Sequence, residues 1–117
     1  MIDFACKTFE IEEVIKCGLS LTKSDYNIME FLIKNNKGGK EYSSNELSRT
    51  MNLDLSTVQR ALKKLNEKNI IIRSQKNLHS GGYVYSYRIR DKSELRKILT
   101  EIIDNWSKKV KSEVEKW

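Results

Sequence analysis

The chain has 117 residues, of which 38% are apolar and 32% are charged, and it carries a net charge of +6 with a pI near 9.3. This length predicts a single domain with a modest core, and the positive charge favours an anionic partner. No apolar run approaches the roughly 18 residues of a membrane span. The N-terminus lacks a basic region followed by an apolar block, so we expect no membrane partner and a cytoplasmic location.

Two cysteines, Cys6 and Cys17, and one histidine, His79, are too few for a disulfide scaffold or a zinc site built from Cys and His. On one continuous helix the two cysteines would lie about 16 Å apart along the axis, which excludes an intrachain disulfide unless the segment bends back. We interpret them as small, semi-buried side chains, with a redox switch between subunits as the alternative. The sequence predicts no metal, no cofactor and no enzyme, because it lacks a phosphate-binding glycine loop and a nucleophile paired with His79.

The first third of the chain predicts two helices. Apolar residues at three- and four-residue spacings indicate a short amphipathic helix over 9–19. A second helix is expected to begin at Thr22, where Asp25 completes a capping box. It should end among the asparagines and glycines of residues 35–39, because glycine permits a left-handed exit.

The middle of the chain predicts two further helices joined by a tight turn. Ser43 and Glu46 form a second capping box, which begins a helix that ends near Met51. Asn52 tolerates the left-handed backbone of the turn, and Asp54 is expected to cap a fourth helix that runs to about residue 68. The predicted inward face of that helix is Val58, Ala61, Leu62 and Leu65.

A two-stranded hairpin is predicted next. The β-branched run 70–74 indicates one strand, the alternating run 83–90 indicates its partner, and the glycine-containing segment 77–82 is the turn. Three tyrosines share one face of the second strand with Ile89, so we expect them to pack against the helices rather than stack on nucleic-acid bases. These tyrosines are Tyr83, Tyr85 and Tyr87.

From Ser93, a candidate cap, one apolar stripe continues for about six helical turns to the end of the chain. A 70-residue neighbour offers too little surface to cover this stripe. We therefore expect the helix to pair with that of a second copy, with folding back within the monomer as the alternative. The predicted dimerisation residues are Leu95, Leu99, Ile102, Trp106, Val110 and Trp117.

The excess positive charge lies entirely within residues 43–90. This stretch holds nine Lys and Arg against three acidic residues, whereas the rest of the chain holds 13 of each sign. A basic pair of helices followed by a hairpin indicates a protein that docks on a polyanion, with duplex DNA as the expected partner.

The order of elements resembles winged helix–turn–helix transcriptional regulators of the MarR/TrmB-like type, in the compact form common in archaea. The resemblance covers about residues 21–90, although Asn52 and Asn69 stand where such proteins often have glycine. It is carried by the segments 21–33, 44–48, 55–65 and 69–73 and by the glycine-containing wing.

This resemblance implies an α+β, mainly α, fold with three parts: an N-terminal helix in 1–20 that supports the dimer or the core, a DNA-binding domain at 21–90, and a dimerisation helix at 91–117. It implies a homodimeric, sequence-specific, double-stranded-DNA-binding transcription regulator, with helix 55–68 in the major groove and the wing at 70–90 on the flanking groove or backbone. An effector ligand cannot be read from the sequence. The alternatives are a winged-helix module for protein–protein interaction and an RNA-binding protein.

Side-chain chemistry divides the expected DNA contacts into two groups. Gln59 can form two hydrogen bonds with adenine and Arg60 two with guanine, whereas lysines more often contact phosphate. The predicted base-reading residues are Ser56, Thr57, Gln59 and Arg60. The predicted backbone contacts are Arg49, Lys63, Lys64, Arg73, Lys76 and Arg88.

Overall fold

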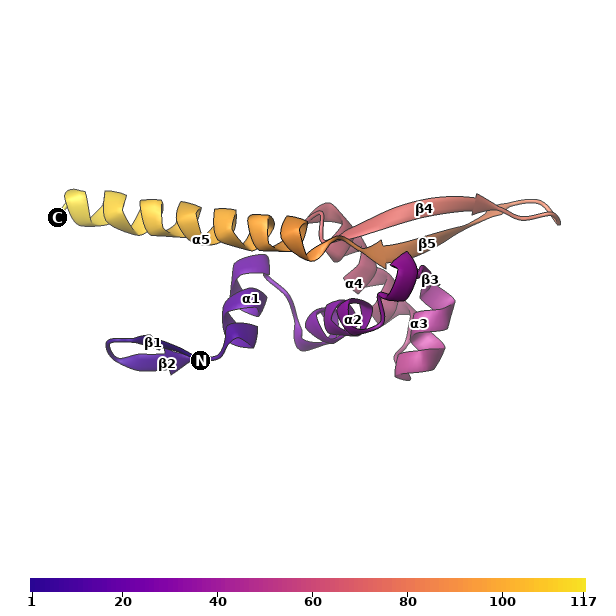
Figure 1. Ribbon diagram of the computed structural model, residues 1–117, viewed down its shortest axis with the longest axis horizontal. Coiled ribbons are helices and arrows are strands. Elements are labelled where there is room, and N and C mark those ends of the chain that lie inside the picture. The colour runs from indigo at the N-terminus through magenta and orange to yellow at the C-terminus, as the bar shows by residue number, and fades with distance from the viewer. The chain divides into compact units, whose positions relative to one another are not determined.

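The computed structural model describes all 117 residues and divides them into two compact units, each of which is considered by itself. One unit is Leu21–Arg90, and the other combines Met1–Ser20 with Asp91–Trp117. The chain is mainly helical, with five α-helices and small antiparallel sheets (Figure 1). The predicted α+β winged-helix fold is confirmed. No helix combines the length and apolar character needed to cross a membrane.

The unit Leu21–Arg90 contains three helices and a three-stranded sheet. Its elements are α2 (Lys23–Lys34), a 3-10 turn (Lys37–Gly39), β3 (Tyr42–Ser43), α3 (Ser44–Met51), α4 (Leu55–Glu67), β4 (Ile71–Asn77) and β5 (Tyr83–Ile89). Both predicted capping boxes form. The Thr22 hydroxyl accepts from the Asp25 N–H while the Asp25 carboxylate accepts from the Thr22 N–H, and Ser43 and Glu46 make the same exchange at α3. These boxes fix where α2 and α3 begin.

The turns on either side of α4 use asparagine in the left-handed conformation, as predicted. Asn52 has φ 53° and Asn69 has φ 61°, a region that asparagine enters at lower cost than most residues. The expectation for Asp54 was only partly correct. Asp54 does stand at the N-cap of α4, but its side chain makes no capping hydrogen bond, so its carboxylate does not contribute to the start of the helix.

The core of this unit lies on the inward face of α4. The four residues predicted to face inward, Val58, Ala61, Leu62 and Leu65, are all buried. They share the core with Ile28 and Leu32 of α2, Leu47 of α3, Ile70 and Ile71. Since a well-packed interior tolerates little rotation of its side chains, this burial fixes which face of α4 points to solvent.

The sheet has the order β3–β5–β4, and its β4–β5 hairpin is the wing (Figure 1). The hairpin pairs from Ile71 opposite Ile89 to Asn77 opposite Tyr83. The third strand, β3, was not predicted, because two residues are too few to produce an alternating pattern. The expectation that all three tyrosines pack inward is wrong for Tyr83, which is 56% exposed because it lies at the far end of the wing, beyond the helices.

The second unit has three elements that precede the winged helix and one that follows it. It contains the hairpin β1 (Ile2–Phe4) and β2 (Lys7–Phe9), then α1 (Ile11–Leu19) and the long α5 (Lys92–Glu115). The predicted helix over 9–19 begins two residues late, because Phe9 belongs to β2. The predicted cap at Ser93 is also wrong, since α5 begins one residue earlier and has Asp91 at its N-cap.

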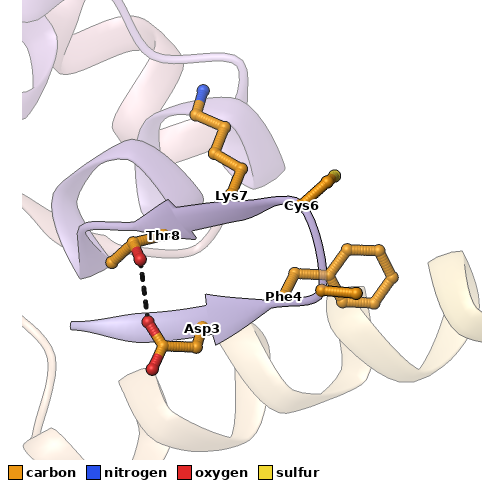
Figure 2. A pocket seen from close by; sticks show the side chains of 6 residues that line it. Asp3, Phe4, Cys6, Lys7 and Thr8 are labelled. Atoms are coloured by element: carbon orange, nitrogen blue, oxygen red, sulfur yellow. Dashed lines mark hydrogen bonds between the residues drawn. The ribbon is translucent and has the colours of Figure 1, made fainter.

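The two cysteines are exposed rather than semi-buried. Cys6 lies at the turn of the β1–β2 hairpin (Figure 2), and Cys17 lies in α1. Both are free thiols. The expectation that they would be semi-buried is therefore wrong for both.

Candidate nucleic-acid interface

The outer face of α4 presents polar side chains that have no partner within the chain. Ser56, Gln59, Arg60 and Lys63 are exposed, and none of them makes a hydrogen bond or an ion pair. Thr57 is half-buried beside them. Because residues three and four positions apart lie on the same side of a helix, Ser56, Gln59, Arg60 and Lys63 form one continuous polar surface. The structure therefore brings together the four predicted base-reading residues and Lys63.

A groove runs between α4 and the N-terminal end of α2. Its walls carry three cations and two hydroxyl groups from the first residues around α2, and two carboxylates lie at its edge. The lining residues are Thr22, Ser24, Asp25, Thr57, Arg60, Lys63, Lys64 and Glu67. With three cations against two carboxylates, the groove carries a small positive excess on the same side of α4 as Arg60.

Lys64, a predicted backbone contact, is held within the chain. Its Nζ lies 2.8 Å from Oδ2 of Asp25, and the exposed fractions of the two side chains are 35% and 8%. Burial raises the pKa of Asp25, but hydrogen bonds from Lys64 and Thr22 outweigh it and leave that pKa below its usual value. Lys64 therefore ties α4 to α2, in contrast to its neighbour Lys63.

Arg49 lies in the last turn of α3, close in sequence to the tight turn that leads into α4. It is exposed and makes no ion pair. The turn itself is closed by hydrogen bonds in both directions: the Leu53 N–H donates to the Ser48 carbonyl at 3.0 Å, and the Ser48 hydroxyl donates to the Leu53 carbonyl at 2.6 Å. These bonds fix α3 relative to α4 and hold Arg49 on a rigid element.

Glu41, immediately before β3, holds two residues of the wing. Its Oε2 accepts from the Ser86 hydroxyl at 2.6 Å and lies 3.1 Å from Nζ of Lys76. These hydrogen bonds from Ser86 and Lys76, with the charge of nearby Arg88, hold the pKa of Glu41 below its usual value. Lys76 and Arg88 were predicted as backbone contacts, and both lie within the electrostatic influence of this one carboxylate.

Arg73 contacts aromatic side chains of the neighbouring strand. Its guanidinium lies 4.3 Å from the centre of the Tyr85 ring and also bonds to Tyr87. Burial raises the pKa of Tyr87, and the positive charge of Arg73 only partly opposes this. Arg73 is nevertheless exposed, so its contact with the Tyr85 ring orients the guanidinium without burying it.

The tip of the wing is a narrow glycine turn. Gly81 and Gly82 have φ 94° and 78°, which side chains rarely adopt, and the Leu78 N–H donates to the Gly82 carbonyl at 3.1 Å. Leu78 and His79 are exposed there. The turn therefore presents one apolar and one imidazole side chain at the end of the hairpin.

Two contributors to this surface were missed by sequence reasoning. Asp25 was recognised only as a cap, and Glu41 was not singled out at all. A local pattern reveals a capping box because its residues are three positions apart, whereas Asp25 meets Lys64 across 39 residues and Glu41 meets Ser86 across 45. Only the fold brings those pairs together.

The predicted dimerisation residues belong to the other unit, and all of them except Trp117 lie on α5. Leu95, Leu99 and Ile102 are half-buried, whereas Trp106 and Val110 are exposed. Trp117 lies beyond the end of α5 and is fully exposed. The first half of the stripe is thus partly covered within the chain and the second half is open. In the whole chain, no group of three or more His, Cys, Asp or Glu side chains is arranged to hold a metal ion.

Comparison with known proteins places this fold among regulators. A solved structure described as a possible transcriptional regulator from Methanosarcina mazei Go1 is 46% identical, with a TM-score of 0.93, and the match covers all of this chain and 96% of that one. A mutant of S. aureus MepR bound to an oligodeoxyribonucleotide matches 87% of this chain and 76% of its own at 16% identity, with a TM-score of 0.51, and so supports the fold alone.

Sequence relatives support a family assignment. The uncharacterized protein MJ1082 of Methanocaldococcus jannaschii is 32% identical over 105 residues, which is 90% of this chain and 83% of that protein. The family described as DnaD N-terminal domain matches residues 9–110, which includes the winged helix and most of the flanking unit. The chain therefore belongs to the DnaD N-terminal domain family.

Proposed function

We propose that the protein is a sequence-specific, double-stranded-DNA-binding transcription regulator that acts as a homodimer. The observation that carries this proposal is the outer face of α4, where Gln59, Arg60 and Lys63 are exposed and unpartnered while the opposite face is buried. A rigid helix with a free polar face fits the major groove, where side chains near its N-terminus reach base edges.

The residues of α4 take two roles in this proposal. Gln59 and Arg60 read base edges, with Ser56 and Thr57 close to the bases or the sugar–phosphate backbone, and each good bidentate pair contributes roughly 1–3 kcal/mol of discrimination. Lys63 and Arg49 contact phosphates, which set the register without specifying sequence. Neither Lys63 nor Arg49 has to leave an ion pair to do so.

The remaining predicted backbone contacts must share or exchange partners. Lys64 is paired with Asp25, Lys76 with Glu41, and Arg73 is stacked on Tyr85. We propose that Lys76 and Arg88 meet phosphates beside the wing once Glu41 is outcompeted, that Arg73 contacts the backbone from its stacked position, and that Lys64 contributes mainly by positioning α4. The wing itself lies on the flanking groove or backbone.

The homodimer is proposed on the open half of α5. A two-fold axis relating two copies would place two α4 helices in successive major grooves, about 34 Å apart, on a pseudo-palindromic site. Residues 1–20 support that dimer, 21–90 bind DNA, and 91–117 supply the pairing helix. The likeness to a possible transcriptional regulator at 46% identity supports this proposal, as does a DNA-bound MepR of the same fold. A closer relation to MarR/TrmB-like regulators is part of the proposal.

Titration with labelled duplex DNA over a range of salt concentrations tests the proposal. We expect affinity to fall steeply with salt, because each neutralised phosphate releases counterion with a slope of about −0.9 in log K against log salt. A selection from random-sequence duplexes should enrich a pseudo-palindrome. An affinity that is flat with salt, or stronger binding to single-stranded or structured RNA, would contradict this function.

A second candidate is a winged-helix module for protein–protein interaction. The observation that favours it is the open apolar stripe on α5, which suits a docking element as well as a homodimer. The two are separated by the variant Lys63→Ala. Loss of DNA affinity in this variant supports the regulator. The affinity for a protein partner that binds through α5 would be unchanged by this substitution.

A further inference from the structure

The β1–β2 hairpin exposes an apolar face. Directly opposite residues in an antiparallel pair lie on the same side, so the register places Ile2, Phe4, Lys7 and Phe9 together. We call these four residues the hairpin face. Asp3 and Thr8 occupy the other side, where the Thr8 hydroxyl donates to the Asp3 carboxylate at 2.8 Å (Figure 2). Phe4 is 67% exposed.

This hairpin is too small to be stable by itself. Each strand has three residues, and an isolated two-stranded hairpin is marginal in water unless its apolar face packs against another element. Within its own chain the hairpin face stays largely open, since Ile2, Phe4 and the adjacent Ile11 are all exposed. The hairpin therefore needs a surface that the single chain does not provide.

The C-terminal part of the chain, residues 106–117, offers a matching apolar surface. Trp106 is 64% exposed, and Val110, Val114 and Trp117 continue the stripe to the chain end. We call these four residues the C-terminal stripe. An aromatic side chain presents roughly 150–250 Å². The stripe and the hairpin face therefore expose an area on the order of the ~800 Å² per partner that a standard interface buries.

The charges beside the two surfaces are opposite. Residues 1–13 contain four acidic side chains and one lysine, a net charge of −3. Residues 107–117 contain four lysines and two glutamates, a net charge of +2. Opposite potentials favour the approach of these two segments.

The middle of α5 already packs against the N-terminal segment of its own chain. A Cβ built on Gly18 would lie 3.3 Å from Cγ2 of Ile102, so the C-terminal end of α1 already packs on the middle of α5. A second copy whose hairpin lay on the C-terminal stripe would extend this contact along the same helix. Because each chain carries both surfaces, a two-fold axis pairs them twice and closes the assembly.

We infer that the β1–β2 hairpin is an arm that docks in trans, with the hairpin face of one copy on the C-terminal stripe of a second copy of this chain. This deepens the proposed function, because it rests on the proposed homodimer and assigns a role within it to residues 1–9. The arm makes the N-terminal segment a determinant of dimer affinity, independently of the DNA-contacting surface on α4.

Single-cysteine chains test this docking directly. One chain keeps Cys6 and carries Cys17→Ser. The other carries Cys6→Ser, Cys17→Ser and Lys109→Cys, which puts a thiol beside the C-terminal stripe. The two are mixed, treated with a short bifunctional maleimide, and the linked peptides are identified by mass spectrometry. We expect a link between the two chains, and no such link when Lys97→Cys, on the opposite side of α5, replaces Lys109→Cys.

A third chain with both Cys6 and Lys109→Cys distinguishes docking in trans from folding back. Linkage within one chain at monomer mass would overturn the inference, as would a stable dimer that links at neither position. Duplex DNA binding by the same single-cysteine chains is titrated in parallel. Absence of the docking contact would thus leave the proposed function intact. Absence of DNA binding by the unmodified protein would instead contradict the proposed function.

A second, quantitative test compares one alanine substitution on each side of the hairpin. Phe4→Ala should raise the dimer dissociation constant at least tenfold, since aromatic anchors dominate interface affinity. Thr8→Ala, on the opposite side, should change it less than threefold. Sedimentation equilibrium measures both constants. Equal effects of the two substitutions would show that hairpin folding, rather than the hairpin face, matters, and would overturn the assigned contact.

Discussion

The Nζ atom of Lys64 in α4 lies 2.8 Å from Oδ2 of Asp25 in α2, and the same oxygen accepts the Thr22 N–H at 2.9 Å. One carboxylate thus completes the capping box of α2 and holds the outer edge of α4. The core fixes the inward face of α4 through apolar packing, and this ion pair adds a polar contact on its flank. The two together determine how the free polar face of α4 is presented.

Replacing Asp25 with Asn should lower the free energy of unfolding by about 1.5–2 kcal/mol, the low end of the roughly 1.5–3 kcal/mol that a hydrogen bond to a charged group contributes. The side-chain oxygen of Asn can still accept the hydrogen bond from the Thr22 N–H, so the change isolates the contact with Lys64. The loss should stay below the 3–5 kcal/mol of a fully buried pair, because Lys64 reaches water. Urea unfolding measures it, with Lys64→Met completing a double-mutant cycle. Strict additivity of the two changes would contradict the coupling.

The same pair predicts a pH dependence. The pKa of Asp25 is lowered from 3.8 in the folded chain, so its contribution is fully present above about pH 4 and is lost as pH falls through the folded pKa. Glu41, whose pKa is also lowered, acts in the same direction. The difference in unfolding free energy between the wild type and Asp25→Asn should therefore shrink on acidification below pH 4 and remain constant from pH 6 to 8. A difference that grows in acid would contradict this assignment.

The left-handed turn between α3 and α4 gives a separate prediction. Asn52 has φ 53°, which costs a β-branched residue roughly 1–2 kcal/mol more than a residue that tolerates this region. Asn52→Val should lower the free energy of unfolding by about that amount, and Asn52→Gly should leave it nearly unchanged or raise it slightly. Thermal unfolding of the two variants provides the comparison. Equal midpoints for Val and Gly would mean that the turn does not require the left-handed conformation.

Asn52 also illustrates which parts of the fold were predictable. The roles of Asn52, Asn69 and the two capping boxes depend only on residues a few positions away in the sequence. They therefore follow from local spacing and backbone preference. The inward face of α4 was equally predictable, because helical periodicity identifies it. These correct predictions share a physical cause that is local, although the caps expected from Ser93 and from the side chain of Asp54 show that a local signal can also mislead.

The features that were missed depend on contacts between residues far apart in the sequence, or on segments too short to show a pattern. The strand β3 has two residues and exists because Tyr42 pairs with Tyr87, and Glu41 belongs to the wing only because β3 lies beside β5. The hairpin at residues 2–9 is similarly short and was not predicted, and only its last residue, Phe9, fell within an expected helix. Within the candidate site, sequence chemistry grouped Lys63 with Lys64, but the fold leaves Lys63 free and pairs Lys64 with Asp25.

Two substitutions on α4 should separate base reading from phosphate contact. Arg60→Ala should weaken binding to the preferred duplex by about 1–3 kcal/mol and relax the preference at one base position. Lys63→Ala should weaken all duplexes about equally and reduce the salt slope by about one unit. Binding to a panel of single-base variants of the selected site measures both. Identical profiles for the two variants would contradict the division of roles.

Trp106→Asp should convert the protein to monomers, because it places a charge in the apolar C-terminal stripe that the proposed homodimer covers. Sedimentation velocity at micromolar concentration measures the change. The matched control is Thr100→Asp, which adds the same charge at an exposed position away from the stripe and should leave the dimer intact. An unchanged dimer for Trp106→Asp, with unaltered helix content, would contradict pairing through α5.

Glu41→Gln should strengthen binding to duplex DNA several-fold at low salt and steepen the salt dependence by up to about one unit, the contribution of one additional phosphate contact. In the free protein Glu41 pairs with Lys76 at 3.1 Å and faces the charge of Arg88, so its carboxylate opposes the approach of a phosphate to the wing. Glutamine removes that charge and releases Lys76, yet it can still accept a hydrogen bond from the Ser86 hydroxyl.

The control Ser86→Ala removes the 2.6 Å hydrogen bond but keeps the Glu41 carboxylate, so the affinity of this variant for DNA should match that of the wild type. Equal affinities for Glu41→Gln and the wild type would mean that Lys76 does not reach DNA, whereas a gain shared by Ser86→Ala would indicate that a looser wing, rather than a released lysine, strengthens binding.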